Sequence, residues 1–134
     1  MDTSPKILLW GFSDDEKTRF DLFLQGLITL GSIAIEPDQG DLLVHDILFS
    51  DKRTQDSFPS DHKVVLFFNV PGEIIQKIMR EAKKKDLSQP IYAMVTQENI
   101  DWRFRDLVDH LAKEHKYIQN RVKERKEGRH RSDN

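Results

Sequence analysis

The sequence predicts an α/β protein built as a three-layer sandwich, with a four-stranded, mainly parallel sheet between helices and a long C-terminal helix. Four short apolar segments have the length of strands, and at least three of them are continuous apolar runs, as in strands that are covered on both faces. Segments with the apolar spacing of helices alternate with them. Right-handed crossovers between parallel strands then favour the strand order 2-1-3-4.

The predicted strands span residues 6–12, 32–36, 63–70 and 90–96. Between the first two, Ser13 and Glu16 have the spacing of a capping box, in which each side chain satisfies a backbone amide at the start of a helix. The apolar residues that follow mark one face of that helix, and Gly31 is placed to end it. A second helix is predicted after Gly72, with lysines near its end, where cations suit the helix dipole.

The segment between the second and third strands departs from simple alternation. Asp41 could cap a short helix, and the polar stretch 50–61 follows it. About twelve residues without a pattern are long for a compact domain, so this stretch is predicted to be a mobile loop or a binding element.

The last helix is predicted to start near Asn99 or Asp101 and to run to about Glu127, because Gly128 is the first strong breaker. Such a helix would be roughly 40 Å long, which exceeds the ~30 Å expected of so small a domain. We therefore expect one α/β domain over residues 1–118 and a basic, frayed or disordered tail over 119–134.

Composition excludes several classes of protein. The 134 residues include 37% hydrophobic residues, enough for one core, and no cysteine, which removes disulfides, thiolate catalysis and cysteine-bound metals. No apolar run approaches a membrane span and the first residues lack a signal segment, so a cytoplasmic location is expected. The five histidines lack metal-ligand spacing, and nucleotide-binding and nucleophile-elbow motifs are missing. We predict no catalytic residue, no metal and no cofactor.

Charge is unevenly distributed although the formal net charge is only −2. Residues 36–62 hold seven acids and two bases, whereas residues 119–134 hold six basic side chains and three acids. Acids also interrupt the basic tail and no aromatic residue lies among its bases. We read the tail as a solvated helix end and expect no nucleic-acid partner.

A ligand site, if present, is expected in the crevice at the carboxyl ends of the strands. The polar residues predicted there are Ser13, Asn69, Thr96 and Asn99. Trp102 follows in the first turn of the last helix, where it could cover the open end of the sheet or stack on a ligand. Ser13 also has the simpler role of a helix cap.

The last helix offers a second candidate surface. Leu111, His115, Ile118 and Val122 follow each other at spacings of four and three, so a heptad seam continues past the core-facing turns. We expect this seam to pair with another copy of the chain or with a protein partner, and His115 to make the pairing sensitive to acid.

A resemblance to a known family is carried by the segments 7–12 and 64–68. Its most specific part is residues 91–96 followed by Asn99, Trp102 and Asp106. They resemble a small prokaryotic α/β family catalogued as a domain of unknown function, DUF3783, over roughly residues 6–115. The resemblance implies the same fold and leaves the function open.

Two functional classes follow from these patterns. The first is a non-enzymatic protein-interaction or regulatory module, favoured by the missing catalytic constellations, the charge asymmetry and the heptad seam. The alternative is a small-molecule binder or an enzyme that uses the strand-end crevice. A formed, partly apolar pocket beside the polar residues would favour the second class, and a filled edge would favour the first.

Overall fold

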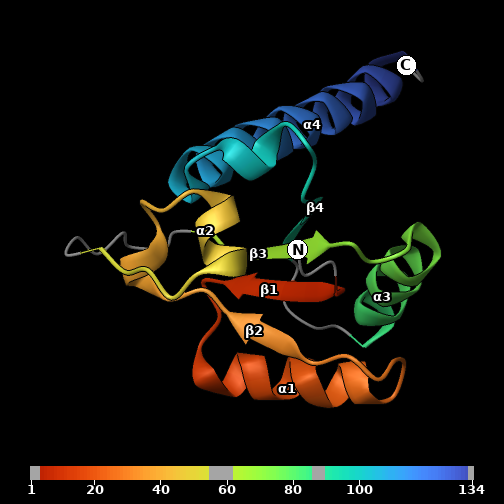
Figure 1. Ribbon diagram of the computed structural model, residues 1–134. Helices are drawn as coiled ribbons and strands as arrows, with labels where there is room; N and C mark the ends of the chain where they lie inside the picture. Colours follow the sequence, from red (N-terminus) through yellow and green to blue (C-terminus); the bar gives the residue numbers. More distant parts are fainter. Residues whose placement is uncertain (1–3, 55–61, 86–89, 133–134) are drawn as a thin grey trace.

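The computed structural model describes residues 4–54, 62–85 and 90–132, with the backbone alone from residue 122 onward. Most of the polar stretch 50–61 therefore lies outside the described residues. The elements, in chain order and with η for a short 3-10 helix, are β1 (Lys6–Trp10), α1 (Asp14–Gln25), β2 (Ser32–Ala34), η1 (Pro37–Gln39), α2 (Val44–Phe49), β3 (Val64–Phe68), α3 (Gly72–Lys84), β4 (Ile91–Met94), η2 (Asn99–Asp101) and α4 (Phe104–Ser132). Each strand falls within a predicted range (Figure 1).

The four strands form one sheet in the predicted order β2-β1-β3-β4, but the sheet is mixed. β1 pairs with β2 in parallel and β3 pairs with β4 in parallel, whereas β1 and β3 run antiparallel, with Lys6 opposite Phe68 and Trp10 opposite Val64. The expected parallel direction is thus wrong at the central pairing. The carboxyl end of β1 and the carboxyl end of β3 consequently lie at opposite ends of the sheet.

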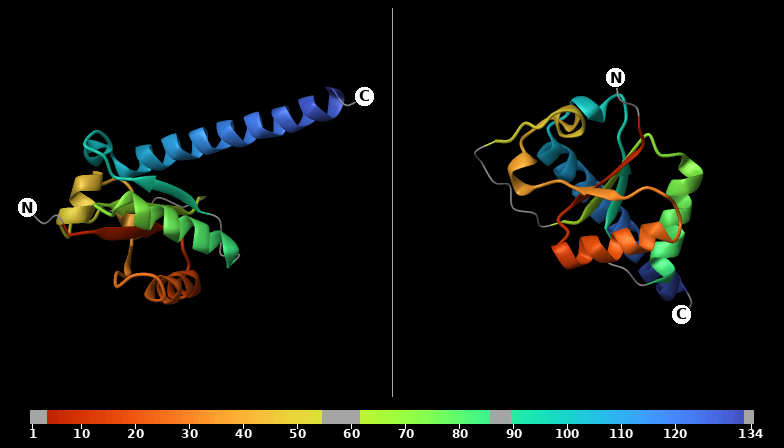
Figure 2. Two further views of the ribbon diagram at one scale, coloured as in Figure 1. Left: turned by 90° about the vertical axis from the view of Figure 1, so that its right-hand side faces the viewer. Right: turned by 60° about the horizontal axis from the view of Figure 1, so that its bottom comes forward.

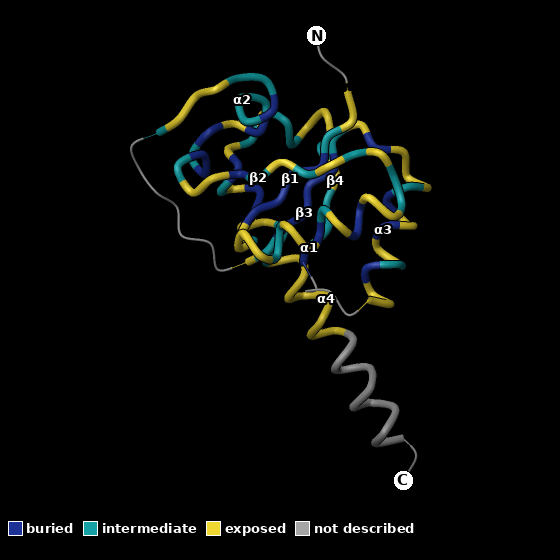
Figure 3. The backbone as a smooth tube through the Cα atoms, turned by 90° about the horizontal axis from the view of Figure 1, so that it is seen from below, coloured by how far each residue is buried: buried dark blue, intermediate teal, exposed yellow. Residues whose placement is uncertain are grey.

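Apolar side chains cover both faces of the sheet and give the three predicted layers. On one face, alternate strand residues such as Ile7 and Phe67 pack with α1 and α3. On the other face, Trp10 and its neighbours pack with α2 and α4, and the Trp10 ring meets the Phe104 ring edge-on at 5.0 Å. Buried residues concentrate along the strands, as Figure 3 shows. Burial on both faces explains the continuous apolar runs of the sequence.

The turn from β1 into α1 confirms the predicted cap. The Glu16 amide donates to Ser13 Oγ at 3.2 Å, and the Ser13 amide donates to Glu16 Oε1 at 3.0 Å. The predicted end of this helix at Gly31 is wrong, because α1 stops at Gln25 and Gly26 caps it. The Gly26 amide donates to the Phe23 carbonyl at 3.2 Å and the Leu27 amide donates to the Leu24 carbonyl at 2.9 Å, each three residues back, so the α-helical pattern ends at the first glycine.

Asp21 ties α1 to β2 and makes stability depend on pH. Burial opposes ionisation of its carboxylate, but hydrogen bonds from Lys17 Nζ at 2.7 Å and from the Ser32 hydroxyl and amide outweigh it, so the pKa of Asp21 lies below its usual value. A lowered pKa stabilises the fold above the unfolded value near 4 and loses that effect as pH falls through the folded value. Asp21→Asn should cost about 1 kcal/mol of unfolding free energy at pH 7.

Urea unfolding at pH 7, 5, 4 and 3 checks this expectation. The difference between Asp21→Asn and the parent protein should persist at pH 7 and 5 and shrink below about pH 4. The control is Asp51→Asn, because Asp51 is exposed. A difference that stays constant down to pH 3 would contradict the argument.

The segment after β2 holds the predicted short helix, but Asp41 does not cap it. Leu43 is the cap residue of α2, and its side chain makes no capping bond. Asp41 instead accepts a hydrogen bond from Arg105 Nη1 at 2.7 Å, which raises the pKa of Arg105. The backbone joins the same two segments, since the Phe104 amide donates to the Leu42 carbonyl at 2.8 Å. This contact anchors the start of α4.

α4 starts at Phe104, after the 3-10 turn of η2, and continues past Gly128 to Ser132. The predicted end at the glycine is therefore wrong, because a single glycine costs only about 1 kcal/mol in a helix. The helix passes over β4 and then projects well beyond the sheet (Figure 2). The domain boundary near residue 118 stays a prediction. Within residues 4–54, 62–85 and 90–132, no helix has the length and apolar character needed to span a bilayer.

Candidate functional site

The antiparallel pairing of β1 and β3 separates the polar residues that the sequence placed in one crevice. Ser13 follows the carboxyl end of β1, at the edge of the sheet where β3 begins. There Glu16 of the same turn pairs with Lys63, which precedes β3. The carboxyl ends of β3 and β4 lie at the opposite end of the sheet, and they are followed by Asn69, Thr96 and Asn99. The structure therefore assigns Ser13 to the helix cap and removes it from the candidate site.

Asn69 has a backbone role at the end of β3. Its φ is 57°, in the left-handed region, where asparagine is tolerated better than most residues with a side chain. It turns the chain from β3 towards α3 and does not line the pocket described below. It lies at the same end of the sheet as Thr96, as the sequence predicted, but outside the lining of this pocket.

Thr96 and Asn99 form a reciprocal pair in the turn after β4. The Thr96 amide donates to Asn99 Oδ1 at 2.7 Å, and the Asn99 amide donates to Thr96 Oγ1 at 3.0 Å. Asn99 Nδ2 also donates to the Met94 carbonyl at 3.0 Å. These polar groups therefore bind one another and fix the shape of the turn that leads to Trp102.

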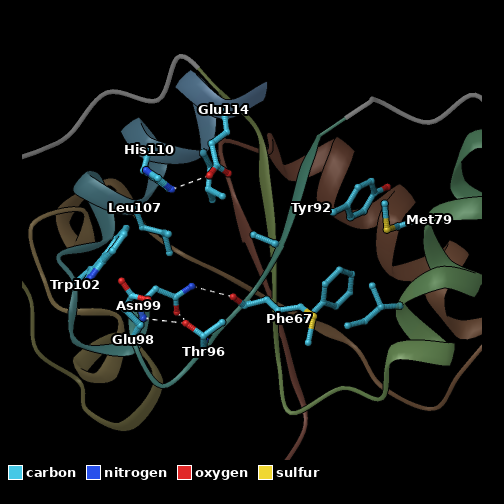
Figure 4. A pocket seen from close by; sticks show the side chains of 14 residues that line it. Phe67, Met79, Tyr92, Thr96, Glu98, Asn99, Trp102, Leu107, His110 and Glu114 are labelled. Atoms are coloured by element: carbon cyan, nitrogen blue, oxygen red, sulfur yellow. Dashed lines mark hydrogen bonds and ion pairs between the residues drawn. The ribbon is translucent and has the colours of Figure 1, made fainter. Parts of the chain in front are cut away.

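A pocket of about 570 Å³ lies over β4, and we call it the β4 pocket. Figure 4 shows β4 running through it, with α4 along one side and α3 along the other. Its lining is mostly apolar. The lining residues are Phe67, Ile75, Met79, Tyr92, Ala93, Met94, Thr96, Glu98, Asn99, Trp102, Leu107, His110, Leu111 and Glu114. Three predicted ligand residues, Thr96, Asn99 and Trp102, are thus brought together, and Ser13 and Asn69 are not.

On the α3 side, Tyr92 and Met79 border the pocket (Figure 4). The Tyr92 ring stacks on Phe67 with their centroids 6.1 Å apart and their planes 11° apart. Burial raises the pKa of the Tyr92 hydroxyl. Met79 keeps 41% of its surface exposed, which leaves a flexible and polarisable side chain at the rim.

On the α4 side, Trp102 and His110 border the pocket, with their rings edge-on at 5.4 Å. His110 Nε2 lies 3.0 Å from Glu114 Oε1, and both side chains are at least half exposed. Trp102 is partly buried against the core under α4, and it also faces the pocket. Both predicted roles of Trp102, cover for the sheet and contact for a ligand, are compatible with this position.

The floor of the pocket is the free edge of the sheet. In the described part of the chain no strand lies beyond β4. The amides of Ile91 and Val95 donate to carbonyls of Lys63 and Phe67 at 2.8 Å. Because successive residues of a strand point in alternate directions, the amides of Tyr92 and Met94 face away from β3. The β4 edge therefore offers backbone donors beside an apolar surface, and Met94 is 53% exposed there.

Sequence reasoning missed the α3 side of the pocket and the pair of His110 with Glu114. The spacing of four between His110 and Glu114 was readable from the sequence. The position of Met79 and Tyr92 was not, because it depends on how α3 packs beside β4. Among the described residues, no group of three or more histidines and carboxylates could hold a metal ion.

The residues predicted for the heptad seam have different surroundings in the structure, and their pairing with a partner stays a prediction. Leu111 lines the β4 pocket, and Ile118 is 60% exposed on the projecting part of α4. His115 is exposed and lines a second hollow with His62 and Ile91 instead. The side chain of Val122 lies outside the described residues.

Comparison with known proteins adds one match. Residues 63–118 match the family model described as a domain of unknown function (DUF3783). The predicted resemblance to this family is confirmed over that segment, and the residues before β3 lie outside it. No curated protein and no solved structure matches the chain.

The DUF3783 segment runs from Lys63 to Ile118 and includes β3, α3, β4, η2 and the first half of α4. Every residue that lines the β4 pocket lies within it. The lining of the pocket therefore comes from the DUF3783 segment alone.

Proposed function

We propose that this protein is a non-enzymatic interaction module that binds an extended segment of another polypeptide along β4. The observation that supports the proposal is the outward backbone edge of β4 at the floor of an apolar pocket, where the amides of Tyr92 and Met94 face away from β3. The Met94 carbonyl on this edge accepts from Asn99 Nδ2 at 3.0 Å, so an added strand would have to displace that bond. Strand addition uses such edges, because backbone hydrogen bonds supply affinity and neighbouring pockets for alternate side chains supply specificity.

The two sides of the pocket suit the two faces of an added strand. A segment paired with β4 would direct alternate side chains to opposite faces of the sheet. One set would reach Tyr92 and Met79 beside α3, and the other would reach Trp102 and Leu111 beside α4. We therefore expect apolar residues at alternate positions of the ligand where one side of the pocket is filled, and at neighbouring positions where both sides are filled.

The rim of the pocket is acidic. Glu98 and Glu114 line it and are exposed, and no lysine or arginine is among the lining residues. Exposed carboxylates add little affinity in water, but they steer oppositely charged partners and disfavour acidic ones. The expected ligand therefore carries a lysine or an arginine beside its apolar residues.

A small-molecule ligand is the second candidate, and the formed, mostly apolar pocket of about 570 Å³ beside Thr96 and Asn99 is the feature expected from the sequence to favour this class. Pockets of 300–1,000 Å³ commonly hold such ligands, with a few polar groups that fix their orientation. In this pocket the polar groups of Thr96 and Asn99 bind one another and the Met94 carbonyl. This arrangement favours recognition through the strand edge over recognition through side chains.

Selection from a random peptide library displayed against the immobilised full-length chain tests the proposal. We expect enriched peptides to carry apolar residues and a basic residue, and to change the fluorescence of Trp102. Trp10 is only 1% exposed, so it should contribute little to that change. A library that yields no peptide with saturable binding in solution would count against the proposal.

Met94→Pro separates the two candidates. Proline removes the outward amide and leaves the ladder bonds of β3 with β4 in place, and an edge strand tolerates it. Peptide affinity should fall about tenfold, since an unsatisfied partner carbonyl costs roughly 1–3 kcal/mol. Met94→Ala is the matched control for loss of the side chain. Equal affinities for Met94→Pro and Met94→Ala would overturn strand addition and favour a ligand held by side chains.

A modified peptide gives the same test without a protein variant. Methylation of those peptide amides that face β4 should abolish binding, whereas methylation of the alternate amides should not. Loss of binding with no period of two along the peptide would contradict the proposed geometry.

A further inference from the structure

We propose that a second copy of this chain packs antiparallel against the projecting part of α4. The surface involved is the α4 stripe, which we define as Leu111, Tyr117 and Ile118. It goes beyond the proposed function because Tyr117 and Ile118 lie outside the β4 pocket.

The α4 stripe continues the apolar face of α4 beyond the sheet. Ile118 follows Leu111 by seven residues, which is two helical turns, and Tyr117 lies beside it on the pocket side. Tyr117 and Ile118 are each 60% exposed, while Leu111 is partly covered by the core. Arg121 extends this surface, with its guanidinium 5.8 Å from the centre of the Tyr117 ring. Tyr117 and Ile118 are thus exposed on the part of α4 that leaves the body of the protein. Figure 2 shows the course of this projecting helix.

The projecting helix itself favours a partner. Residues 118–132 form about four turns of helix that lie beyond the sheet. Isolated helices of this length are only marginally stable in water, and most helical stability comes from packing of an apolar face. A partner helix along the α4 stripe would supply that packing.

The charge pattern along α4 identifies the partner as another copy in antiparallel orientation. Residues 98–109, which comprise the turn before α4 and the first residues of the helix, hold four acids and two bases, and residues 121–131 hold six bases and two acids. An antiparallel pair would place the acidic start of each helix beside the basic end of the other, twice by symmetry. A parallel pair would place like charges together, which costs stability. The chain is therefore complementary to itself in one orientation.

Sedimentation equilibrium of the full chain, from low micromolar to several hundred micromolar, tests the proposal. We expect a reversible monomer–dimer equilibrium that weakens at least tenfold in Ile118→Glu. The matched control is Lys116→Glu, because Lys116 is exposed and lies about 160° around the helix from Ile118. A chain that stays monomeric throughout, or a dimer that Ile118→Glu leaves unchanged, would overturn the proposal.

Charge exchange tests the antiparallel orientation. One variant carries Lys113→Glu and Arg121→Glu, and the other carries Asp101→Lys and Asp106→Lys. Each variant alone should dimerise at least tenfold more weakly than the parent chain, because each brings like charges together. An equimolar mixture should form a heterodimer close to the parent in affinity. If each variant dimerises as well as the parent chain, the antiparallel arrangement is wrong.

Peptide binding separates this inference from the proposed function. Ile118→Glu should leave the affinity for a library-selected peptide within about twofold, because residue 118 does not line the β4 pocket. Loss of the dimer with retained peptide binding supports both proposals. Retained peptide binding by a chain that is always monomeric overturns this inference alone.

Discussion

Phe104→Ala should destabilise the protein by about 3–5 kcal/mol, which is the usual cost of removing a buried aromatic ring from a core. Phe104 is completely buried, and its ring packs edge-on against Trp10 at 5.0 Å. The residue is also the first of α4, so its ring fixes the helix over the sheet. Loss of the ring would leave a cavity between β1 and α4.

Urea unfolding followed by Trp10 fluorescence measures this effect. The matched control is Lys116→Ala on the same helix, because Lys116 is exposed and faces away from the α4 stripe, so its truncation should change stability by less than about 0.5 kcal/mol. The loss of unfolding free energy in Phe104→Leu should lie between the losses in Phe104→Ala and in the control. A loss below about 1 kcal/mol in Phe104→Ala would mean that α4 does not depend on this contact.

Gly11→Val should destabilise the protein by about 1–3 kcal/mol through the backbone alone. Gly11 has a φ of 81°, in the region that β-branched residues avoid, and it forms the turn between β1 and α1. Because Gly11 is exposed, the added side chain displaces no core residue. The strain therefore arises from the dihedral angle and not from packing.

Gly72→Ala is the matched control for Gly11→Val. A Cβ on Gly72 would meet no heavy atom within 4 Å, and α3 begins at this residue. The alanine should be neutral or should stabilise the protein by up to about 1 kcal/mol, because it restricts the unfolded chain. Thermal unfolding of both variants compares them directly. Equal melting temperatures for the two variants would refute the backbone argument.

Local signals in the sequence predicted most of the elements correctly. The capping box of Ser13 and Glu16 acts through residues three apart, so no tertiary contact is needed to form it. The strands were identified from runs such as residues 64–68, because burial on both faces requires apolar side chains at every position. The error at Asp41 arose because its carboxylate binds the distant Arg105 and does not cap α2. The errors at Gly31 and Gly128 were local, since α1 ends at the earlier Gly26 and a single glycine does not end α4.

The candidate site was predictable only in part. The turn that holds Thr96, Asn99 and Trp102 is local, so the sequence placed these three residues together correctly. Tyr92 and Met79 join them because β4 is the edge strand and α3 packs beside it, which depends on contacts between distant segments. Ser13 lies outside the site for the same reason. The direction of β1 relative to β3 puts Ser13 at the opposite end of the sheet from Thr96 and Asn99.

The sequence by itself determined the α/β class, the four strands, the two covered faces and the strand order. Only the tertiary structure decided that β1 and β3 run antiparallel, and with it which polar residues lie at the same end of the sheet. The physical reason is that side chains alternate across a strand in the same way in parallel and antiparallel sheets, so an apolar pattern carries no direction. The long connection between β2 and β3 lets the chain enter the sheet from either end, and the packing of α2 and α4 on one face selects the end that is used.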